Sequence, residues 1–329
     1  MMSLTINDIR AAEQRIEGIA VKTPLVTSRY LNELLDAKVY IKLENLQHIG
    51  AFKFRGAYNR LCQLNEEERK RGVVAFSSGN HAQGIALAAK MLNLKATIVM
   101  PNDAPKLKLE GTLRLGAKVL EYDRSTESRE EIAAGIAKSY GSTLVPAFED
   151  YSIMAGQGTI GLEVADQLSS EKEKLDAYIA PVGGGGLLAG TSVAIKALIP
   201  GAQIYGVEQE GFDDHVLSRK AGRRITIKQT KPTLCDALMA TTPGKMTWSI
   251  NSKTVTDFLV VSEDEVAHAV AFAFLRLKVV VEPGGVVALA SLLEKKIEVA
   301  GKTIVIVLSG GNIDSNAFRY CLEKFPNPM

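Results

Sequence analysis

The chain has 329 residues, of which 46% are hydrophobic and 23% are charged, a composition typical of a globular protein with one large or two medium domains. Its 39 basic residues nearly balance 37 acidic ones, and the net charge of +2 does not indicate binding to nucleic acid or an anionic membrane. No apolar run reaches membrane-spanning length, the N-terminus does not resemble a leader, and the three cysteines lack disulfide or zinc spacing, which together predict a cytoplasmic protein.

The N-terminal region is predicted to contain a helix, a strand and a second helix. Thr5 or Asn7 can cap the first helix, whose apolar face runs from Ile9 to Ile19 at helical spacing. The β-branched and aromatic run of residues 38–43 predicts a strand, and residues 55–64 predict the second helix.

Lys53 lies just before this second helix, in the sequence GAFKFRGA of residues 50–57. Phe52 and Phe54 flank the lysine, and the N-terminal end of a helix carries partial positive charge. Both features lower the pKa of an amine toward the range in which it is nucleophilic, as a Schiff-base lysine requires. The alternative is an ordinary charged residue in the first turn of a helix.

The rest of the chain alternates short apolar runs with longer amphipathic segments. The predicted strands are residues 73–76, 96–100, 118–121, 175–182, 203–207, 258–261 and 304–308, and the predicted helices include residues 80–92, 105–115, 128–140 and 186–198. This rhythm is typical of right-handed β–α–β units. We therefore predict an α/β fold with two lobes, each a parallel sheet flanked by helices.

Four consecutive glycines, residues 183–186, stand where an apolar strand leads into a helix. Glycines allow the backbone to approach an anion closely, and the free N–H groups of the following helix point toward it, so a phosphate is the expected ligand. The spacing matches neither the ATP-binding P-loop nor the dinucleotide fingerprint. The alternative is a flexible turn, which is entropically costly in a tightly connected α/β unit.

Two further polar loops follow predicted strands, at residues 77–81 (SSGNH) and residues 309–312 (SGGN). Taken alone, the first is also consistent with a simple helix cap at Ser78 or Asn80. However, open α/β folds bind ligands at the carboxyl ends of their strands, where all three loops are expected to lie.

These motifs, in this order, make the chain resemble the fold-type II pyridoxal phosphate (PLP) enzymes, and among them the serine/threonine dehydratase and serine racemase family. The resemblance covers nearly the whole chain, including the IMAGQGT sequence of residues 153–159. It implies a fold similar to the tryptophan synthase β subunit. Residues 1–47 and 146–329 would form a large PLP-binding domain and residues 48–145 a small domain, with the cofactor between them.

The resemblance also implies roles for the residues that would bind the cofactor. Lys53 would hold it covalently, Phe52 would pack on its ring, Asn80 would bond its 3-oxygen, and Ser309 would meet the ring nitrogen. The glycines Gly183, Gly184, Gly185 and Gly186 would bind its phosphate. A neutral hydroxyl at the ring nitrogen favours loss of a β-substituent over transamination.

Substrate contacts are implied for the loop that contains Ser77, Ser78, Gly79 and His81. Ser78 stands where racemases carry a serine that faces the lysine across the cofactor, so it is a second candidate catalytic residue. Arg129 matches an arginine that can bind a second carboxylate, such as that of hydroxyaspartate. The alternative for Arg129 is an exposed arginine at a helix start.

A divalent cation site is implied at the acidic loop of residues 208–214. Glu208, Asp214 and the backbone carbonyl of Phe212 would supply hard oxygen ligands for Mg²⁺ or Ca²⁺. The alternative is a solvated acidic loop. His215, next to it in sequence, lacks ligand spacing and is expected to be a packing or surface residue. Glu282 occupies a family position near the cofactor ring, but relatives vary where this sequence continues with Pro-Gly-Gly, so we assign it no role.

The function that follows is a PLP-dependent dehydratase, or ammonia-lyase, that converts L-threonine or L-serine to 2-oxobutyrate or pyruvate plus ammonia. A serine racemase, a 3-hydroxyaspartate dehydratase and a β-replacement enzyme are the alternatives within the class. A catalytically inactive amino-acid or nucleotide sensor is the alternative outside it. The expected partner is a small amino-acid substrate, with no nucleic acid and no membrane, and the family resemblance implies a homodimer or homotetramer.

Overall fold

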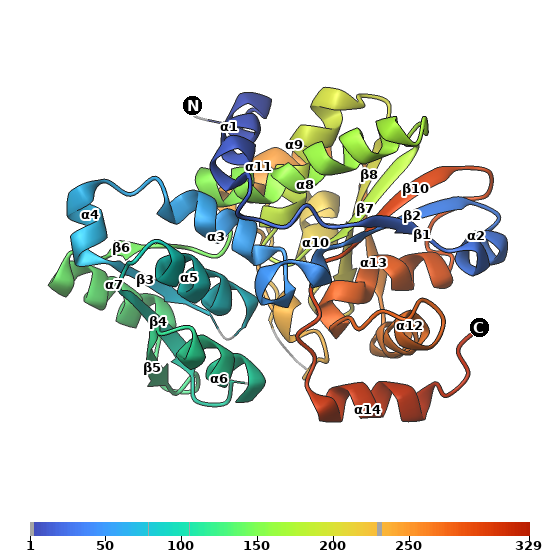
Figure 1. The fold of residues 1–329 in the computed structure, drawn as a ribbon. Helices are drawn as coiled ribbons and strands as arrows, with labels where there is room; N and C mark the ends of the chain where they lie inside the picture. Colours follow the sequence, from blue (N-terminus) through green and yellow to red (C-terminus); the bar gives the residue numbers. More distant parts are fainter. Residues whose placement is uncertain (1–2, 78, 105, 229–231) are drawn as a thin grey trace.

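The computed structural model describes residues 3–77, 79–104, 106–228 and 232–329. Figure 1 shows two sheets side by side, each covered by helices. The predicted α/β class is therefore confirmed, with most neighbouring strands parallel. Within the described ranges, no helix is both long and apolar enough to cross a membrane.

The larger sheet has six strands in the order β1-β2-β10-β7-β8-β9. They are β1 (Leu25–Thr27), β2 (Lys38–Leu43), β7 (Ala177–Pro181), β8 (Gln203–Gln209), β9 (Asp257–Val261) and β10 (Thr303–Leu308). Only the short edge strand β1 departs from the parallel pattern, because it pairs antiparallel with β2. Strand β10 is buried along its whole length, which is why its sequence is continuously apolar.

The smaller sheet has four parallel strands in the order β5-β4-β3-β6. They are β3 (Val73–Phe76), β4 (Ala96–Pro101), β5 (Lys118–Tyr122) and β6 (Thr143–Leu144). Its strands lie between residues 73 and 144, inside the predicted small domain, while those of the larger sheet lie outside it. The exact domain boundaries stay a prediction.

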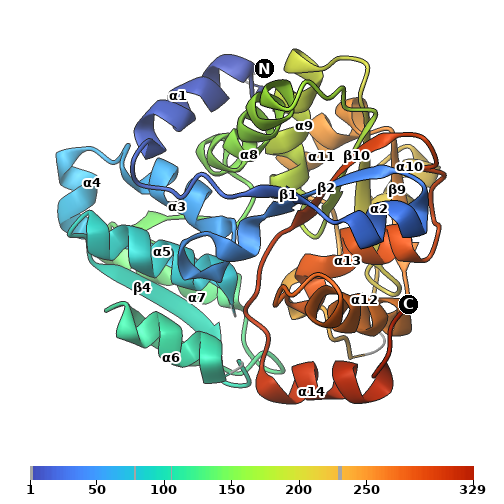
Figure 2. The same cartoon turned by 45° about the vertical axis from the view of Figure 1, so that its right-hand side comes forward.

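Helices cover both faces of each sheet (Figures 1 and 2). They are α1 (Ile6–Ile16), α2 (Arg29–Leu35), α3 (Lys53–Leu61), α4 (Glu66–Arg71), α5 (Asn80–Met91), α6 (Lys106–Arg114), α7 (Arg129–Tyr140), α8 (Tyr151–Ser170), α9 (Gly186–Leu198), α10 (Asp214–Ala221), α11 (Lys245–Thr254), α12 (Glu263–Leu275), α13 (Pro283–Leu293) and α14 (Ser315–Lys324). Short 3₁₀ turns are η1 (Glu44–Leu46), η2 (His48–Gly50) and η3 (Asp236–Leu238). Side chains of β10 alternate between a core formed with α12 and α13 and a core formed with α8 and α9.

Two predicted helices differ from the observed ones at their ends. Helix α1 is capped by Thr5, which is one of the two predicted caps. It ends at Ile16 because Gly18 adopts a left-handed conformation with φ of 69°. The face predicted to reach Ile19 is therefore shorter. Helix α3 begins at Lys53 rather than at Arg55, so the lysine occupies its first turn.

Helix α3 reaches its position by crossing the long helix α8 at two glycines. A Cβ on Gly56 would lie 2.6 Å from the carbonyl oxygen of Ile153, and one on Gly156 would lie 2.6 Å from the Cα of Gly56. On its other side, α3 packs in the same core as α5 of the smaller lobe. Lys53 therefore stands on a helix that contacts both lobes.

The side chain of Arg55 fixes this helix from within the core. Its guanidinium is fully buried and donates to both oxygens of Glu44 at 2.8 Å and to Glu163 at 2.6 and 3.0 Å. Lys42 donates to the same Glu163 carboxylate at 2.6 Å and completes a network of two cations and two anions. Burial opposes the charge of Arg55, but Glu44 and Glu163 raise its pKa above the ordinary value.

Replacing Arg55 by methionine should destabilise the fold strongly, because Glu44 and Glu163 would lose their guanidinium partner in the core. Removing one partner of a buried ion pair costs about 3–5 kcal/mol. Urea unfolding measures the loss. The matched control is Arg29→Met, which removes an exposed arginine paired with Glu33 at 2.7 Å and should change stability by less than about 0.5 kcal/mol. Equal losses in the two variants would contradict the role of the buried network.

Candidate active site

Three loops that follow strands face one another between the lobes. The glycine loop, defined as residues 183–186, follows β7, and Ser309 follows the neighbouring parallel strand β10. Parallel neighbours end at the same edge of a sheet, so these two loops lie side by side. Ala51 pairs with Gly310 in a β-bridge, and the amide of Phe52 donates to the Ser309 carbonyl at 3.1 Å. The segment that leads to Lys53 is thereby attached to the end of β10.

The ammonium group of Lys53 lies at the centre of this region. Its Nζ donates to the carbonyl of Ala147 at 2.9 Å and lies 5.2 Å from the centroid of the Phe52 ring. Burial lowers the pKa of Lys53 to about 8. Its neutral, nucleophilic fraction therefore grows as the pH rises through about 8, two or more units below the range of an ordinary lysine.

Side chains of α11 bind the carbonyl groups of the glycine loop. Thr247 Oγ1 donates to the Gly184 carbonyl at 2.6 Å, and Asn251 donates to the Gly185 carbonyl at 3.2 Å. Gly185 has φ of 94°, and a Cβ there would lie 2.8 Å from Asn251 Nδ2. Within the described chain, the four loop amides donate to no protein acceptor, and they stand at the N-terminal end of the 13-residue helix α9. Unpaired amides at a helix N-terminus fit a phosphate group.

Phe148 connects the glycine loop to the lysine. A Cβ on Gly184 would lie 2.2 Å from the ring of Phe148, and one on Gly186 would lie 2.8 Å from its Cβ. The preceding residue, Ala147, supplies the carbonyl that accepts from Lys53. Glycines are therefore required at residues 184 and 186 by the close approach of the segment that also positions the lysine.

Asn80 and Ser309 present polar groups on the other sides of the site. Asn80 is the first residue of α5 and donates through Nδ2 to Glu282, while its Oδ1 accepts from Asn312 Nδ2 at 2.8 Å. Ser309 is 6% exposed, and its amide donates to the Gly285 carbonyl at 3.1 Å. The family resemblance assigns both residues to contacts with a pyridine ring, and these roles stay predictions.

The loop expected to bind substrate is only partly described, because Ser78 lies outside the described residues. Ser77 accepts through Oγ from the Gly79 amide at 3.2 Å. His81 is buried and donates from Nε2 to the Val145 carbonyl at 3.1 Å. Burial and the nearby charge of Lys53 lower the pKa of His81 to about 3, so the ring is neutral, and its buried Nδ1 has no donor among the described residues.

Arg129 lies near this loop, although it comes from α7. Its guanidinium stacks over the ring of Phe76 with 5.3 Å between Cζ and the ring centroid, and Phe76 is the residue directly before Ser77. The Arg129 side chain is 47% exposed and pairs with Glu130 at 2.9 Å. The arginine stands at a helix start and is exposed, as the alternative predicted, and its role in binding a second carboxylate stays a prediction.

Glu208 and Asp214 come together at the end of β8, next to the glycine loop's strand. Both are fully buried, and His215 Nδ1 lies 3.2 Å from a Glu208 oxygen and 3.4 Å from an Asp214 oxygen. Neither oxygen of Asp214 accepts a hydrogen bond from the described residues, and burial raises the pKa of this carboxyl. A buried carboxylate without donors fits a cation ligand. The predicted alternative of a solvated loop is wrong for these two side chains.

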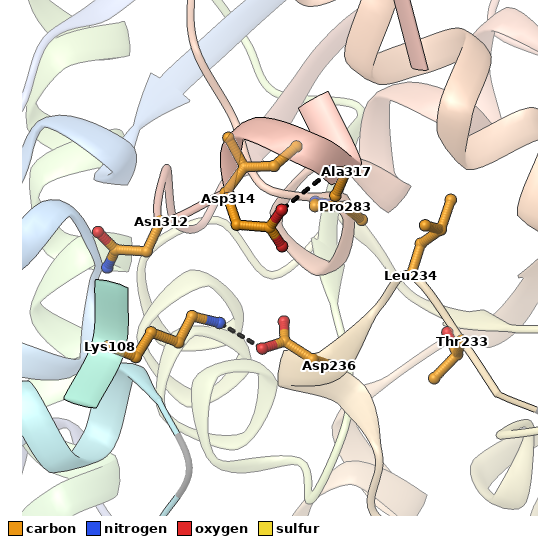
Figure 3. Close-up of a pocket in the computed structure, with 9 residues that line it drawn as sticks. Lys108, Thr233, Leu234, Asp236, Pro283, Asn312, Asp314 and Ala317 are labelled. Atoms are coloured by element: carbon orange, nitrogen blue, oxygen red, sulfur yellow. Dashed lines mark hydrogen bonds and ion pairs between the residues drawn. The ribbon is translucent and has the colours of Figure 1, made fainter. Parts of the chain in front are cut away.

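Residues that no sequence pattern singled out complete the site. Lys108 on α6 pairs with Asp236 at 2.5 Å and lies 3.5 Å from Glu282, and Figure 3 shows the first contact beside a cavity of about 170 Å³. His215, expected to be a packing or surface residue, packs against the rings of Trp248 and Phe258 and also lies close to the carboxylates of Glu208 and Asp214. These contacts join residues up to 174 positions apart, which spacing in one sequence does not reveal.

Comparison with known protein families matches residues 16–310 to the family described as "Pyridoxal-phosphate dependent enzyme". The chain is 44% identical to the L-threo-3-hydroxyaspartate ammonia-lyase of Saccharomyces cerevisiae, over 97% of this chain and 96% of that protein. It is 42% identical to the L-threonine ammonia-lyase of Thermotoga maritima, over 98% of this chain and 79% of that protein.

Among solved structures, the chain is similar to that of maize serine racemase. The two superpose with a TM-score of 0.91 at 34% identity, covering 99% of this chain and 98% of that one. The fold predicted from the sequence is confirmed by this similarity, and the relatives include enzymes named for each of the substrates considered above.

Replacing Gly185 by alanine should weaken cofactor binding, because the new Cβ would push Asn251 and Thr247 away from the loop carbonyls they hold. We expect the dissociation constant for PLP to rise at least about tenfold, an effect of about 1.4 kcal/mol. Titration of the apoprotein by absorbance measures it. Gly116→Ala is the matched control, because Gly116 has φ of 89° and open space where a Cβ would go. Equal PLP affinity in both variants would refute the role of the glycine loop in binding the PLP phosphate.

Proposed function

The chain belongs to the pyridoxal-phosphate dependent enzyme family, and from this premise we propose that it is an ammonia-lyase acting on β-hydroxy amino acids, with L-threonine and L-serine as substrates. The observation that carries the proposal is the placement of Lys53. Its amine has a lowered pKa and reaches the Ala147 carbonyl, next to the residue that packs on a cradle of unpaired amides. This placement supports a covalent site for an aldehyde close to a phosphate site.

PLP, when bound, supplies an electron sink that acidifies the Cα–H of an amino acid. Phe52 would pack on its ring, Asn80 would bond the ring oxygen, and Ser309 would meet the ring nitrogen with a neutral hydroxyl. The glycine loop would hold its phosphate. The amine of Lys53 is the base that would take the Cα proton, and its pKa of about 8 suits that task near neutral pH. The β-hydroxyl would leave with a proton as water, and hydrolysis of the released enamine by water would give the 2-oxo acid and ammonia.

Substrate carboxylate binding is assigned to the loop that opens α5. Gly79 and Asn80 stand at the N-terminus of this 12-residue helix, where backbone amides favour an anion. The Ser77 hydroxyl and the His81 ring border the same loop. His81 is buried and neutral, so it can shape the pocket without adding charge. The sequence alone assigns Ser78 to this loop's function, as the group that in a racemase would exchange a proton on the face of the cofactor opposite Lys53.

A second candidate function is dehydration of 3-hydroxyaspartate, which carries a second carboxylate. The stacking of Arg129 on Phe76 favours it, because this contact holds a guanidinium next to the substrate loop with half of its surface free. An arginine so placed can bind a carboxylate through charge-assisted hydrogen bonds. The Saccharomyces cerevisiae relative is named for this substrate.

We also propose that Glu208, Asp214 and the Phe212 carbonyl bind Mg²⁺ or Ca²⁺. The carboxylate of Asp214, which is buried and accepts no hydrogen bond from the described residues, supports a cation there. Glu208 accepts hydrogen bonds from the amides of His215 and Val216 at 2.9 Å. A cation bound by Glu208 would therefore also affect the position of the start of α10. A cytoplasmic location and a homodimer or homotetramer are further parts of the proposal, and the three free cysteines fit a reducing compartment.

The test is release of 2-oxo acid from L-serine, L-threonine and the 3-hydroxyaspartates, with and without Mg²⁺ and EDTA. We expect turnover that EDTA lowers several-fold, and a loss of at least about 10³-fold in Lys53→Ala because the covalent base is gone. Lys70→Ala, which removes an exposed lysine, should keep the rate. Chiral analysis of leftover serine detects racemisation. No oxo acid from any substrate by the PLP-loaded protein would refute the lyase.

Replacing Arg129 by methionine separates the two candidate substrates. If Arg129 binds a second carboxylate, kcat/KM for 3-hydroxyaspartate should fall about 10- to 100-fold, the size of a lost charge-assisted bond, while that for L-serine changes less than about twofold. Arg124→Met is the control, because Arg124 is a similarly exposed arginine paired with Asp103 at 2.7 Å. Equal losses for both substrates would assign Arg129 a structural role.

A further inference from the structure

Lys108 is a buried lysine that connects the two lobes. It comes from α6 of the smaller lobe and is 2% exposed, yet its ammonium pairs with Asp236 of η3 at 2.5 Å, in the larger lobe. In Figure 3 the two side chains point toward one another across the space between α6 and η3. A lysine needed only for solubility would be exposed, since burying an ammonium is costly unless it is paired.

Glu282 links this pair to the residues around the cofactor site. Its Oε1 accepts from Asn80, and its Oε2, which accepts no hydrogen bond from the described residues, lies 3.5 Å from the Lys108 ammonium. The Glu282 amide donates to the Gly310 carbonyl at 2.9 Å, and a Cβ on Gly310 would lie 2.2 Å from Glu282 Oε1. The Glu282 carboxylate is therefore packed between Lys108, Asn80 and the loop that follows Ser309.

The stem of Lys108 also lies against the substrate loop. A Cβ on Gly79 would lie 3.1 Å from Lys108 Cδ and 3.4 Å from its Nζ. The same lysine thus contacts the loop backbone on one side and two carboxylates of the other lobe on the other side. A shift of its ammonium would move Glu282, and through Glu282 it would move Asn80.

We propose that Lys108 is a positioning residue of the active site, whose ammonium joins the lobes and holds Glu282 and the Gly79–Asn80 loop in register with the cofactor-binding residues. It touches neither the reacting atoms nor Lys53, and it acts through Glu282 and Asn80. The inference rests on the proposed function only in that Asn80 is assigned to the cofactor ring. A purely structural role would instead leave the cofactor environment unchanged when the charge is removed.

The experiment compares Lys108→Met, which keeps the length and removes the charge, with Lys108→Arg, which keeps the charge. In Lys108→Met we expect the absorption band of bound PLP to shift, its dissociation constant to rise at least about tenfold, and kcat to fall more than KM changes, because Glu282 and Asn80 lose their support. Lys108→Arg should restore at least half of the cofactor affinity. Arg124→Met, which removes an exposed ion pair within the smaller lobe, should match the wild type.

The proposal is overturned if Lys108→Met lowers the urea midpoint but leaves the PLP spectrum, PLP affinity and kcat within about twofold of the wild type. If Lys108→Met does not fold, Asp236→Asn removes only the partly exposed end of the pair and should give the same changes at smaller size. An unchanged spectrum and affinity in a folded Asp236→Asn would then overturn it. The PLP absorption spectrum and the PLP affinity can be measured without turnover. If the wild-type protein were inactive on every substrate, the proposed lyase function would be refuted, but these two measurements would still test the role of Lys108.

Discussion

The buried guanidinium of Arg55 is the interaction on which the arrangement of the site depends. It stands two residues after Lys53 on the same helix, and its bonds to Glu44 and Glu163 attach that helix to η1 and to α8. Arg55, Glu44 and Lys42 are fully buried and Glu163 is nearly so, and buried charges are stable only when they are almost completely paired, which restricts the geometry of this network. The backbone of Lys53 is held in place as well, because only one residue separates it from Arg55.

Close backbone approach is the second constraint, and it explains where glycines are needed. The α3–α8 crossing at Gly56 and Gly156 sets the depth of the lysine, while Phe148, Thr247 and Asn251 occupy the space where side chains of the glycine loop would go. In the described parts of the chain the amides of the glycine loop donate to no protein acceptor. The glycine loop and Lys53 are therefore positioned by one connected set of packing contacts.

The charged groups that connect the two lobes are the third constraint, and burying them costs free energy. Lys108, Asp236 and Glu282 place one cation and two anions between the lobes, and burial raises the pKa of Glu282 while Lys108 opposes that rise. Asp236 is partly exposed, which lets water reach one end of the pair. The arrangement ties the lobe that carries the substrate loop to the lobe that carries Ser309 and the glycine loop.

The sequence by itself determined the α/β class, most strand positions, and the candidate residues in the three loops and around Lys53, because apolar periodicity and glycine-rich strand ends are local signals. It also placed Glu208 and Asp214 on one loop. Only the tertiary structure decided that Arg55 is a buried anchor, that His215 touches the two carboxylates, and that Lys108 reaches Glu282. Those contacts join segments from different strands and lobes, and their partners are chosen by packing and charge compensation in three dimensions, which no spacing along the chain encodes.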